Sequence, residues 1–305
     1  MGTWRDVVVP THLENWPKQL RALSIPQVDI PISIEEAVAL GSNIVEWGPS
    51  FAMTPEEREQ EAAALRSSMA AVSARMAGLP VPDVIKPPPV VDRRRDISGI
   101  RSRVSDALRG FPGGAFVRLG SRSPKDAWLG HRTGFRCCAD DGKDPLRFIL
   151  DCSERMYEDL STAIAENYEP HIFVRRWMEF DPQWEFRCFM RDRELVGISQ
   201  YNYREHCRFL DEKSIRNRIE DFFPGFRDAC HLDSVVFDVV IIPPVGGVHT
   251  VLLEINPWFG WTDPCLFSWK DGGDFDGTLR LAPPNQEREL TLDEALADLA
   301  DGADE

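Results

Sequence analysis

The chain has 305 residues, 43 % of them apolar, and its formal net charge at neutral pH is −15. That apolar content is enough to bury the core of one or two domains. So acidic a surface disfavours non-specific binding to nucleic acids and anionic membranes, although it still allows a local cationic cleft.

The cysteines and the N-terminal residues indicate the compartment. The seven cysteines contain no CxxC pair, so we expect reduced thiols rather than a disulfide framework or a zinc site. The first residues lack a charged-then-apolar leader pattern, and no apolar run approaches the roughly 18 residues of a membrane helix. We therefore expect a cytoplasmic protein.

The first hundred residues are expected to form an accessory region with two helices. A short helix is expected over 33–40. A threonine N-cap, a first-turn proline and a capping-box glutamate predict a longer helix over 54–76. The prolines of 86–95 then predict an extended linker or an edge segment.

Helices and strands follow in a mixed order that predicts an α+β fold. The strands and helices do not alternate regularly, as they would in a parallel sheet. Short connections instead favour antiparallel strand pairing, with Arg191-Asp192-Arg193 as one hairpin loop. The expected helices are 97–109, 153–166, 212–223 and one from about Thr291; the expected strands are 115–119, 172–180, 185–190, 194–200, 234–242 and 249–255.

The clearest candidate site lies in the last two long strands. Asp238 interrupts an apolar run, and a carboxylate buried there needs a cation or hydrogen-bond donors. Glu254 and Asn256 are two residues apart, so in a strand both side chains point to one face. If the strands pair, the three side chains converge into a set of hard oxygen ligands suited to Mg²⁺. Solvent-facing positions on half-exposed strands are the alternative.

A second candidate is the segment 116–126. A strand ends in the cationic Arg118, and a loop of small residues carries Arg122 and Lys125. Backbone amides and cations in such a loop can bind phosphates. An ordinary surface turn is the alternative.

Two further arginines lie on predicted strands. Arg176 and Trp177 end a β run, where backbone groups can read an adenine with Arg176 directed at phosphate; a structural edge strand is the alternative. Glu185 and Arg187 share a face of the next strand, either as an ion pair or as a phosphate-contacting arginine held by its neighbour. The histidines show no metal-binding spacing, and we find no nucleophile motif.

Seven segments of the chain carry a family resemblance: LENWPKQLRALSIPQVDIP (13–31), FVRLGSRSPKDAW (116–128), FVRRWMEF (173–180), EFRCFMRDRELVGISQYNY (185–203), VVFDVV (235–240), LLEINPWFGWTD (252–263) and LFSW (266–269). In this order they resemble the cell division cycle protein 123 family of ATP-grasp proteins, whose eukaryotic members help to assemble translation initiation factor 2. The resemblance implies an α+β ATP-grasp fold with ATP held between antiparallel sheets of two lobes.

The implied lobes divide the chain into three parts. The N-terminal lobe covers 1–172 and includes the phosphate loop 116–126. The C-terminal lobe covers 173–290 and includes the hinge and the Mg²⁺ site, and a helix with an acidic tail covers 291–305.

The resemblance also implies roles for single residues. Arg118 and Lys125 stand where the family has a phosphate-binding lysine and an arginine, so the two cations are exchanged. Arg176 matches a hinge lysine, and the hinge around Trp177 would hold the adenine. Arg187 matches a strand arginine near the triphosphate.

The implied Mg²⁺ ligands are those already selected from the strand pattern. Asp238, Glu254 and Asn256 match the family's ligand positions, with Glu254 in place of an aspartate. The extra methylene can shift the metal but leaves the ligand type unchanged.

Three functions follow from these expectations. An ATP-dependent ligase or phosphotransferase would use Lys125 and Arg187 as catalytic cations, forming an acyl-phosphate that an amine or thiol captures, or adenylating an RNA end. An assembly chaperone would use bound ATP to shape a surface for a GTPase of the initiation factor 2 type. A non-catalytic nucleotide-binding scaffold is the third. We favour the enzyme slightly over the chaperone, with ATP and Mg²⁺ as cofactors and with no acceptor identified.

Overall fold

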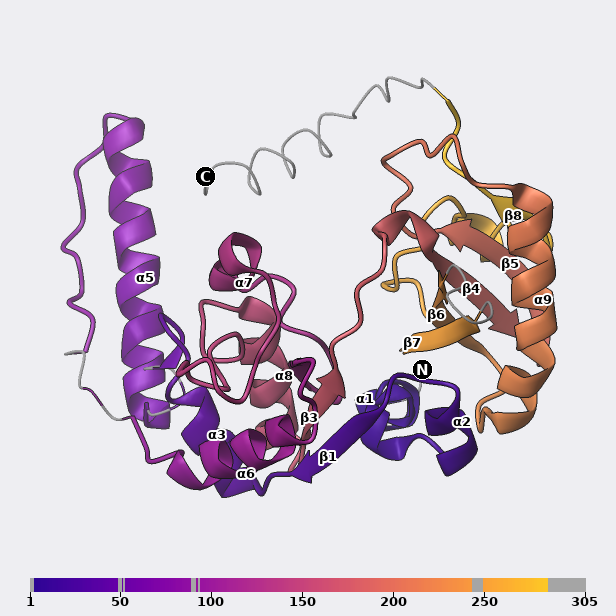
Figure 1. Cartoon of the computed structure of the whole chain (residues 1–305). Helices are drawn as coiled ribbons and strands as arrows, with labels where there is room; N and C mark the ends of the chain where they lie inside the picture. Colours follow the sequence, from indigo (N-terminus) through magenta and orange to yellow (C-terminus); the bar gives the residue numbers. More distant parts are fainter. Residues whose placement is uncertain are drawn as a thin grey trace. The chain divides into compact units, whose positions relative to one another are not determined.

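The computed structural model forms two compact units (Figure 1). The first ends at Glu179 and the second begins at Phe180, whereas the sequence placed the boundary between 172 and 173. The helix and acidic tail expected over 291–305 lie outside the described residues. The structure describes residues 3–48, 51, 53–88, 92, 94–242 and 249–284.

The first unit is built on a three-stranded antiparallel sheet in the order β1-β3-β2. The strands are β1 (Gln27–Pro31), β2 (Ala115–Leu119) and β3 (His171–Arg176). β2 has the expected range, but β3 stops before Trp177 instead of continuing to 180. β1 corrects the expectation that the first hundred residues are only an accessory region, because it forms an edge of this sheet.

The longer helices of the first unit begin where the sequence predicted them. The hydroxyls of Ser33, Thr54 and Ser153 each accept a hydrogen bond from the backbone N–H three residues later. The first N–H groups of a helix have no acceptor within the helix, and this side-chain bond satisfies one of them. These residues cap α3 (Ile34–Gly41), α5 (Pro55–Met76) and α8 (Glu154–Ala165). Further helices among the described residues include α1 (Trp4–Val7), α2 (Lys18–Ala22), α6 (Ser98–Arg109) and α7 (Trp128–Thr133).

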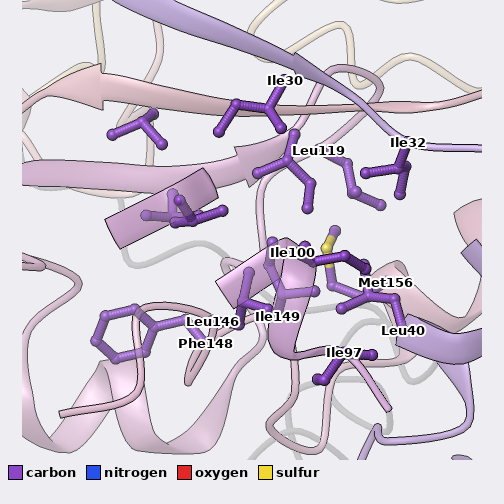
Figure 2. Close-up of a cluster of buried hydrophobic side chains, with 14 of the residues drawn as sticks. Ile30, Ile32, Leu40, Ile97, Ile100, Leu119, Leu146, Phe148, Ile149 and Met156 are labelled. Atoms are coloured by element: carbon purple, nitrogen blue, oxygen red, sulfur yellow. The ribbon is translucent and has the colours of Figure 1, made fainter. Parts of the chain in front are cut away.

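One face of this sheet packs against helices to form the core of the first unit (Figure 2). Ile172 and Val174 alternate along β3 and are fully buried. α6 contributes residues spaced by four, as one face of a helix requires. Other members of this core include Ile30, Ile32, Leu40, Ile100, Val104, Leu108, Leu119, Phe148 and Met156.

The opposite face of the same sheet is covered by the N-terminal segment 13–24. Arg21 contacts Asp29 of β1 at 3.2 Å and lies 5.9 Å from the ring centre of Phe173 on β3. Leu13 donates its backbone N–H to Gly120 at 3.1 Å. Trp16 is buried and donates its indole N–H to the Thr11 carbonyl at 2.8 Å. This segment therefore completes the first unit.

The second unit contains a five-stranded sheet in the order β7-β6-β4-β5-β8. Its pairs are antiparallel except β5 with β8. The expected hairpin is confirmed: Asp192 and Arg193 form a two-residue turn with φ of 51° and 65°, which a type I′ turn requires. The strands are β4 (Glu185–Arg191), β5 (Glu194–Gln200), β6 (Val235–Ile242), β7 (His249–Pro257) and β8 (Leu279–Arg280).

Helix α9 (Glu212–Ala229) covers one face of this sheet (Figure 1). The rings of Phe226 on α9 and Phe237 on β6 are stacked, with their centres 3.9 Å apart. The prediction that the helix ends at 223 was wrong. Pro224 removes one backbone hydrogen bond, but burial of Phe226 on the sheet holds the last turns in place.

The other face of the sheet carries an aromatic cluster at one end. Phe189 of β4 packs against Trp258, Phe267, Trp269 and Phe275, with ring centres 4.7–6.4 Å apart.

Across the described ranges, no helix is long and apolar enough to cross a membrane. All seven cysteines fall within the described residues, and each is a free thiol.

Candidate functional site

A row of polar side chains crosses the second sheet beside the aromatic cluster. Arg187 of β4 faces Asp238 of β6, and Asp238 faces Glu254 of β7. Residues directly opposite each other in antiparallel strands project to the same side, so these three lie on the face opposite α9. Ser199 of β5 continues the row next to Arg187.

Arg187 and Asp238 form a buried bidentate ion pair. Arg187 Nε donates to Asp238 Oδ1 and Arg187 Nη2 donates to Asp238 Oδ2, each at 2.8 Å. The two side chains are only 6 % and 1 % exposed. Burial by itself lowers the pKa of Arg187, but the charge and hydrogen bonds of Asp238 outweigh it and hold that pKa well above its usual value. Arg187 is therefore the cation that the buried carboxylate needs.

Further contacts fix the Arg187 guanidinium. Its Nη1 donates to the backbone oxygen of Asp263 at 2.8 Å, and its central carbon lies 4.8 Å from the ring centre of Tyr201. Three of its five N–H groups are thus engaged by Asp238 and Asp263. Burial raises the pKa of the nearby Cys265 thiol to about 12, so this residue stays neutral at physiological pH.

A β-bulge shapes the carboxylate end of the row. Asp238 pairs with Glu254, but the next residue, Val239, pairs with Leu252, so Leu253 is the extra residue of β7. Such bulges bend a strand and redirect its side chains.

The orientation of the Asn256 side chain follows from its hydrogen bond. Asn256 Nδ2 donates to Asp238 Oδ2 at 3.3 Å. Because an ionised carboxylate only accepts hydrogen bonds, the amide nitrogen must be the atom that faces Asp238. The amide oxygen is therefore the atom of Asn256 that a cation would contact.

The expected phosphate loop lies in the first unit, after β2. Arg118 is 4 % exposed, and its Nε donates to the Leu119 carbonyl at 2.9 Å. Arg122 donates to Asp159 at 2.7 Å and to Glu158 at 2.8 Å, both on α8. A phosphate at Arg122 would therefore compete with two carboxylates. Lys125, in the same loop, is exposed.

The expected hinge follows β3 in the same unit. Arg176 is exposed and donates its backbone N–H to the Pro26 carbonyl at 2.9 Å, and Trp177 donates its own to the Gly114 carbonyl at 2.9 Å. The Trp177 indole N–H and the buried Ser123 hydroxyl have no hydrogen-bond partner among the described residues. Buried polar atoms are normally paired. A ligand at the hinge or the loop could supply these hydrogen bonds, although other buried polar atoms of the first unit, such as those of Gln27, also have no partner among the described residues.

Comparison with known proteins identifies the family of this chain. A family model described as D123 matches residues 56–288, which is more than half of the chain. The chain belongs to the D123 family.

Curated D123 relatives are similar over part of their length. A protein named Cell division cycle protein 123 from Phaeosphaeria nodorum is 30 % identical over 188 residues, covering 57 % of this chain and 46 % of that protein. One named Translation initiation factor eIF2 assembly protein from Emericella nidulans is 30 % identical over 198 residues, covering 58 % and 47 %. This D123 chain thus spans about half the length of the curated relatives it matches.

A solved structure shows the fold of this D123 chain. The structure of Cdc123 from Schizosaccharomyces pombe matches with a TM-score of 0.65 at 18 % identity, covering 93 % of this chain and 99 % of that one. The expected α+β class with antiparallel sheets is confirmed by this match and by the strand pairing.

The D123 chain brings together four of the residues selected from its sequence: Arg187, Asp238, Glu254 and Asn256. Among the described residues, no group of three or more His, Cys, Asp or Glu side chains gathers as a metal site. The donor set here is instead two carboxylates and an amide oxygen, which fits Mg²⁺ when waters and phosphate oxygens complete its shell.

The sequence did not reveal that Arg187 pairs with Asp238. Both residues interrupt apolar runs in strands, so each needs a partner if it is buried. Two opposite charges with the same requirement are the signal that could have identified the pair. The role of the Asp263 carbonyl in holding Arg187 had no signal in the sequence.

Proposed function

We propose that this D123 chain binds ATP with Mg²⁺ and takes part in assembling a translation initiation factor of the eIF2 kind. The observation that carries the nucleotide part is the row of Arg187, Asp238, Glu254 and Asn256 on one face of the second sheet. The assembly part is supported by the name of its relatives, Translation initiation factor eIF2 assembly protein.

In this proposal, the second unit holds the cation. Glu254, Asp238 and the amide oxygen of Asn256 would bind Mg²⁺, which would neutralise phosphate oxygens when bound. Arg187 fixes the orientation of Asp238 through its two parallel hydrogen bonds. Because Asp238 already shares its charge with Arg187, we expect its own attraction for the cation to be reduced.

In the first unit, we propose that the loop after β2 and the segment after β3 contact the nucleotide. Arg118 and Lys125 would contact phosphates, and Arg176 and Trp177 would lie at the adenine. The unpaired Ser123 hydroxyl and Trp177 indole support these positions. Arg122 is the weakest candidate because two carboxylates already bind it.

An exposed tryptophan supports the presence of a protein partner. Trp261 is 63 % exposed, and its ring centre lies 3.8 Å from that of Phe259. Exposed aromatic side chains are enriched in the buried centres of protein interfaces. Trp258, by contrast, packs in the aromatic cluster of the second unit. We propose Trp261 as a contact for the initiation factor.

An ATP-dependent ligase or phosphotransferase is the alternative. The same row favours it, because an arginine beside a cation site is what phosphoryl transfer needs to stabilise charge on the transferred group. In that case Lys125 and Arg187 would be the catalytic cations.

Nucleotide binding is tested by calorimetry with ATP and Mg²⁺. We expect binding that needs Mg²⁺ and is weakened at least tenfold by Asn256→Ala and by Glu254→Gln. The matched control is Glu194→Gln, which changes an exposed glutamate in another strand of the same sheet. The absence of any ATP binding by the wild type would refute the proposal.

The two functions are distinguished by the nucleotide products and by partner binding. Chromatography after incubation with Mg–ATP should show no ADP or AMP beyond the Asn256→Ala background if the chain is an assembly factor. Binding to initiation factor 2 from the same organism should then require ATP and weaken with Trp261→Ala. Turnover that is lost in Asn256→Ala would instead establish the enzyme.

A further inference from the structure

Helix α5 exposes a continuous apolar seam. Four large apolar side chains of this helix are exposed to solvent: Leu65 by 62 %, Met69 by 63 %, Val72 by 56 % and Met76 by 86 %. With half-buried Ala62 they are spaced three, four, three and four residues apart. This is the a and d spacing of a heptad repeat, which places all five side chains in one line along the helix.

The opposite side of α5 is already covered by the chain itself. Gly78 adopts a φ of 67° and ends the helix, with Gly78 N donating to Arg75 at 3.2 Å and Leu79 N donating to Ala74 at 2.9 Å. The chain then runs back beside α5, and Ile85 N donates to the Ser67 hydroxyl at 2.9 Å (Figure 1). The apolar seam lies roughly half a turn away from this contact.

The charges of α5 are divided between its two halves. The first two turns carry four glutamates and one arginine, Arg58, and are acidic on balance, whereas from residue 62 to 76 the helix has only Arg66 and Arg75 as charged residues. Two such helices therefore repel when parallel, because their acidic ends meet, and attract when antiparallel. The acidic residues of the first half are Glu56, Glu57, Glu59 and Glu61.

We propose that α5 pairs with α5 of a second copy of this chain, antiparallel and seam to seam. In this register Leu65 faces Met69 of the second copy and Ala62 faces Val72, each contact occurring twice about a two-fold axis. Glu61 and Arg75, on the same flank of the seam, then meet across the pair.

The arginine beside the middle of the seam, Arg66, is compatible with this pairing. Arg66 lies close to Arg66 of the second copy, but its Nη2 is bound to Glu59 of its own helix at 2.7 Å, which offsets the repulsion. The helix is already folded on each copy, so association does not have to order it. Two heptads form a short seam, and we expect dissociation in the micromolar range.

Sedimentation of the full chain from 1 to 200 µM tests the pairing. We expect a reversible dimer in the wild type and at least a tenfold weaker one in Met69→Glu. Ala70→Glu is the matched control, because it adds the same charge one residue away at an exposed position outside the seam. Circular dichroism of both variants checks that the helix is retained.

Charge exchange tests the orientation. Glu61→Arg and Arg75→Glu should each weaken the dimer several-fold, and the double variant should restore it. Restoration by Glu61→Arg with Arg66→Glu instead would show a parallel pair and overturn the arrangement. A wild type that stays monomeric at 200 µM, or a dimer unaffected by Met69→Glu, would overturn the proposal altogether.

Discussion

Arg187 and Asp238 face each other from neighbouring strands with almost no access to water. Removing one partner leaves the other charge buried without compensation, which costs about 3–5 kcal/mol in comparable pairs. We expect Arg187→Met to lower the free energy of unfolding by about that amount. Urea denaturation followed by fluorescence measures it.

The double variant Arg187→Met with Asp238→Leu is the control for this prediction. Replacing both charges with apolar side chains of similar size removes the uncompensated charge, so most of the lost stability should return. A loss below about 1 kcal/mol in the single variant would contradict the view that this pair is buried.

Asp29 and His171 form a second, half-buried pair in the first unit, with Nδ1 and Oδ1 2.5 Å apart. Burial lowers the pKa of His171, but the hydrogen bond and charge of Asp29 outweigh it and raise that pKa above 6.5. Burial also raises the pKa of Asp29, but His171 and Arg21 outweigh it and lower that pKa below 3.8. Both groups are therefore charged together in the folded chain at mildly acidic pH.

These shifts predict how stability depends on pH. A histidine with a raised pKa stabilises the fold fully below 6.5, and this contribution is lost as the pH rises through the folded pKa. The stability difference between wild type and His171→Gln should thus be largest near pH 5 and shrink above pH 6.5. Urea denaturation at each pH measures it, with the exposed His249→Gln as control. A difference that grows with pH would contradict this assignment.

At the scale of elements, the contact between the segment 13–24 and the loop after β2 depends on Gly120. A Cβ built on Gly120 would lie 1.8 Å from a carboxylate oxygen of Glu14 and 3.1 Å from the Phe173 ring. We expect Gly120→Ala to lower the free energy of unfolding by about 1–3 kcal/mol, because the buried Glu14 has to move. Thermal or urea denaturation measures the change.

Gly99 in α6 is the matched control. A Cβ at this position meets no atom within 4 Å, and alanine favours a helix. Gly99→Ala should therefore be neutral or slightly stabilising. Equal destabilisation by both substitutions would show that the segment 13–24 does not pack tightly on the loop.

The elements that the sequence predicted are those with local signals. Caps at Ser33, Thr54 and Ser153 set helix starts within a residue of those observed. β1 was missed because it is short and bordered by prolines, and it is stabilised by its pairing with a strand far along the chain. The continuation of α9 past Pro224 depends on tertiary burial, which local rules do not contain.

The candidate site was only partly predictable for the same reason. Alternation within one strand predicted that Glu254 and Asn256 share a face. The partner of Asp238 depends on β4 lying next to β6, and the two residues are 51 positions apart. Strand order of that kind is decided by the packing of the whole sheet and is not visible in any single segment.

At the scale of the whole molecule, the net charge of −15 limits the partners. Phosphate backbones are repelled unless basic side chains cluster, and many arginines here are paired with carboxylates, as Arg122 is. We expect a 20-nucleotide single-stranded RNA to bind more weakly than about 100 µM at low salt, measured by fluorescence anisotropy. Low-micromolar binding that weakens with salt would instead favour RNA-end chemistry.

The row of charged side chains on the second sheet has an electrostatic consequence. Sheets normally have little net dipole, because the peptide dipoles of neighbouring strands largely cancel. Here side chains break that cancellation: Arg187, Asp238 and Glu254 stand on successive strands, positive on β4 and negative on β6 and β7. The sheet is therefore polarised across its strands. A ligand pairing an anion with a cation would be turned by this field, its cation toward β7 and its anion toward β4.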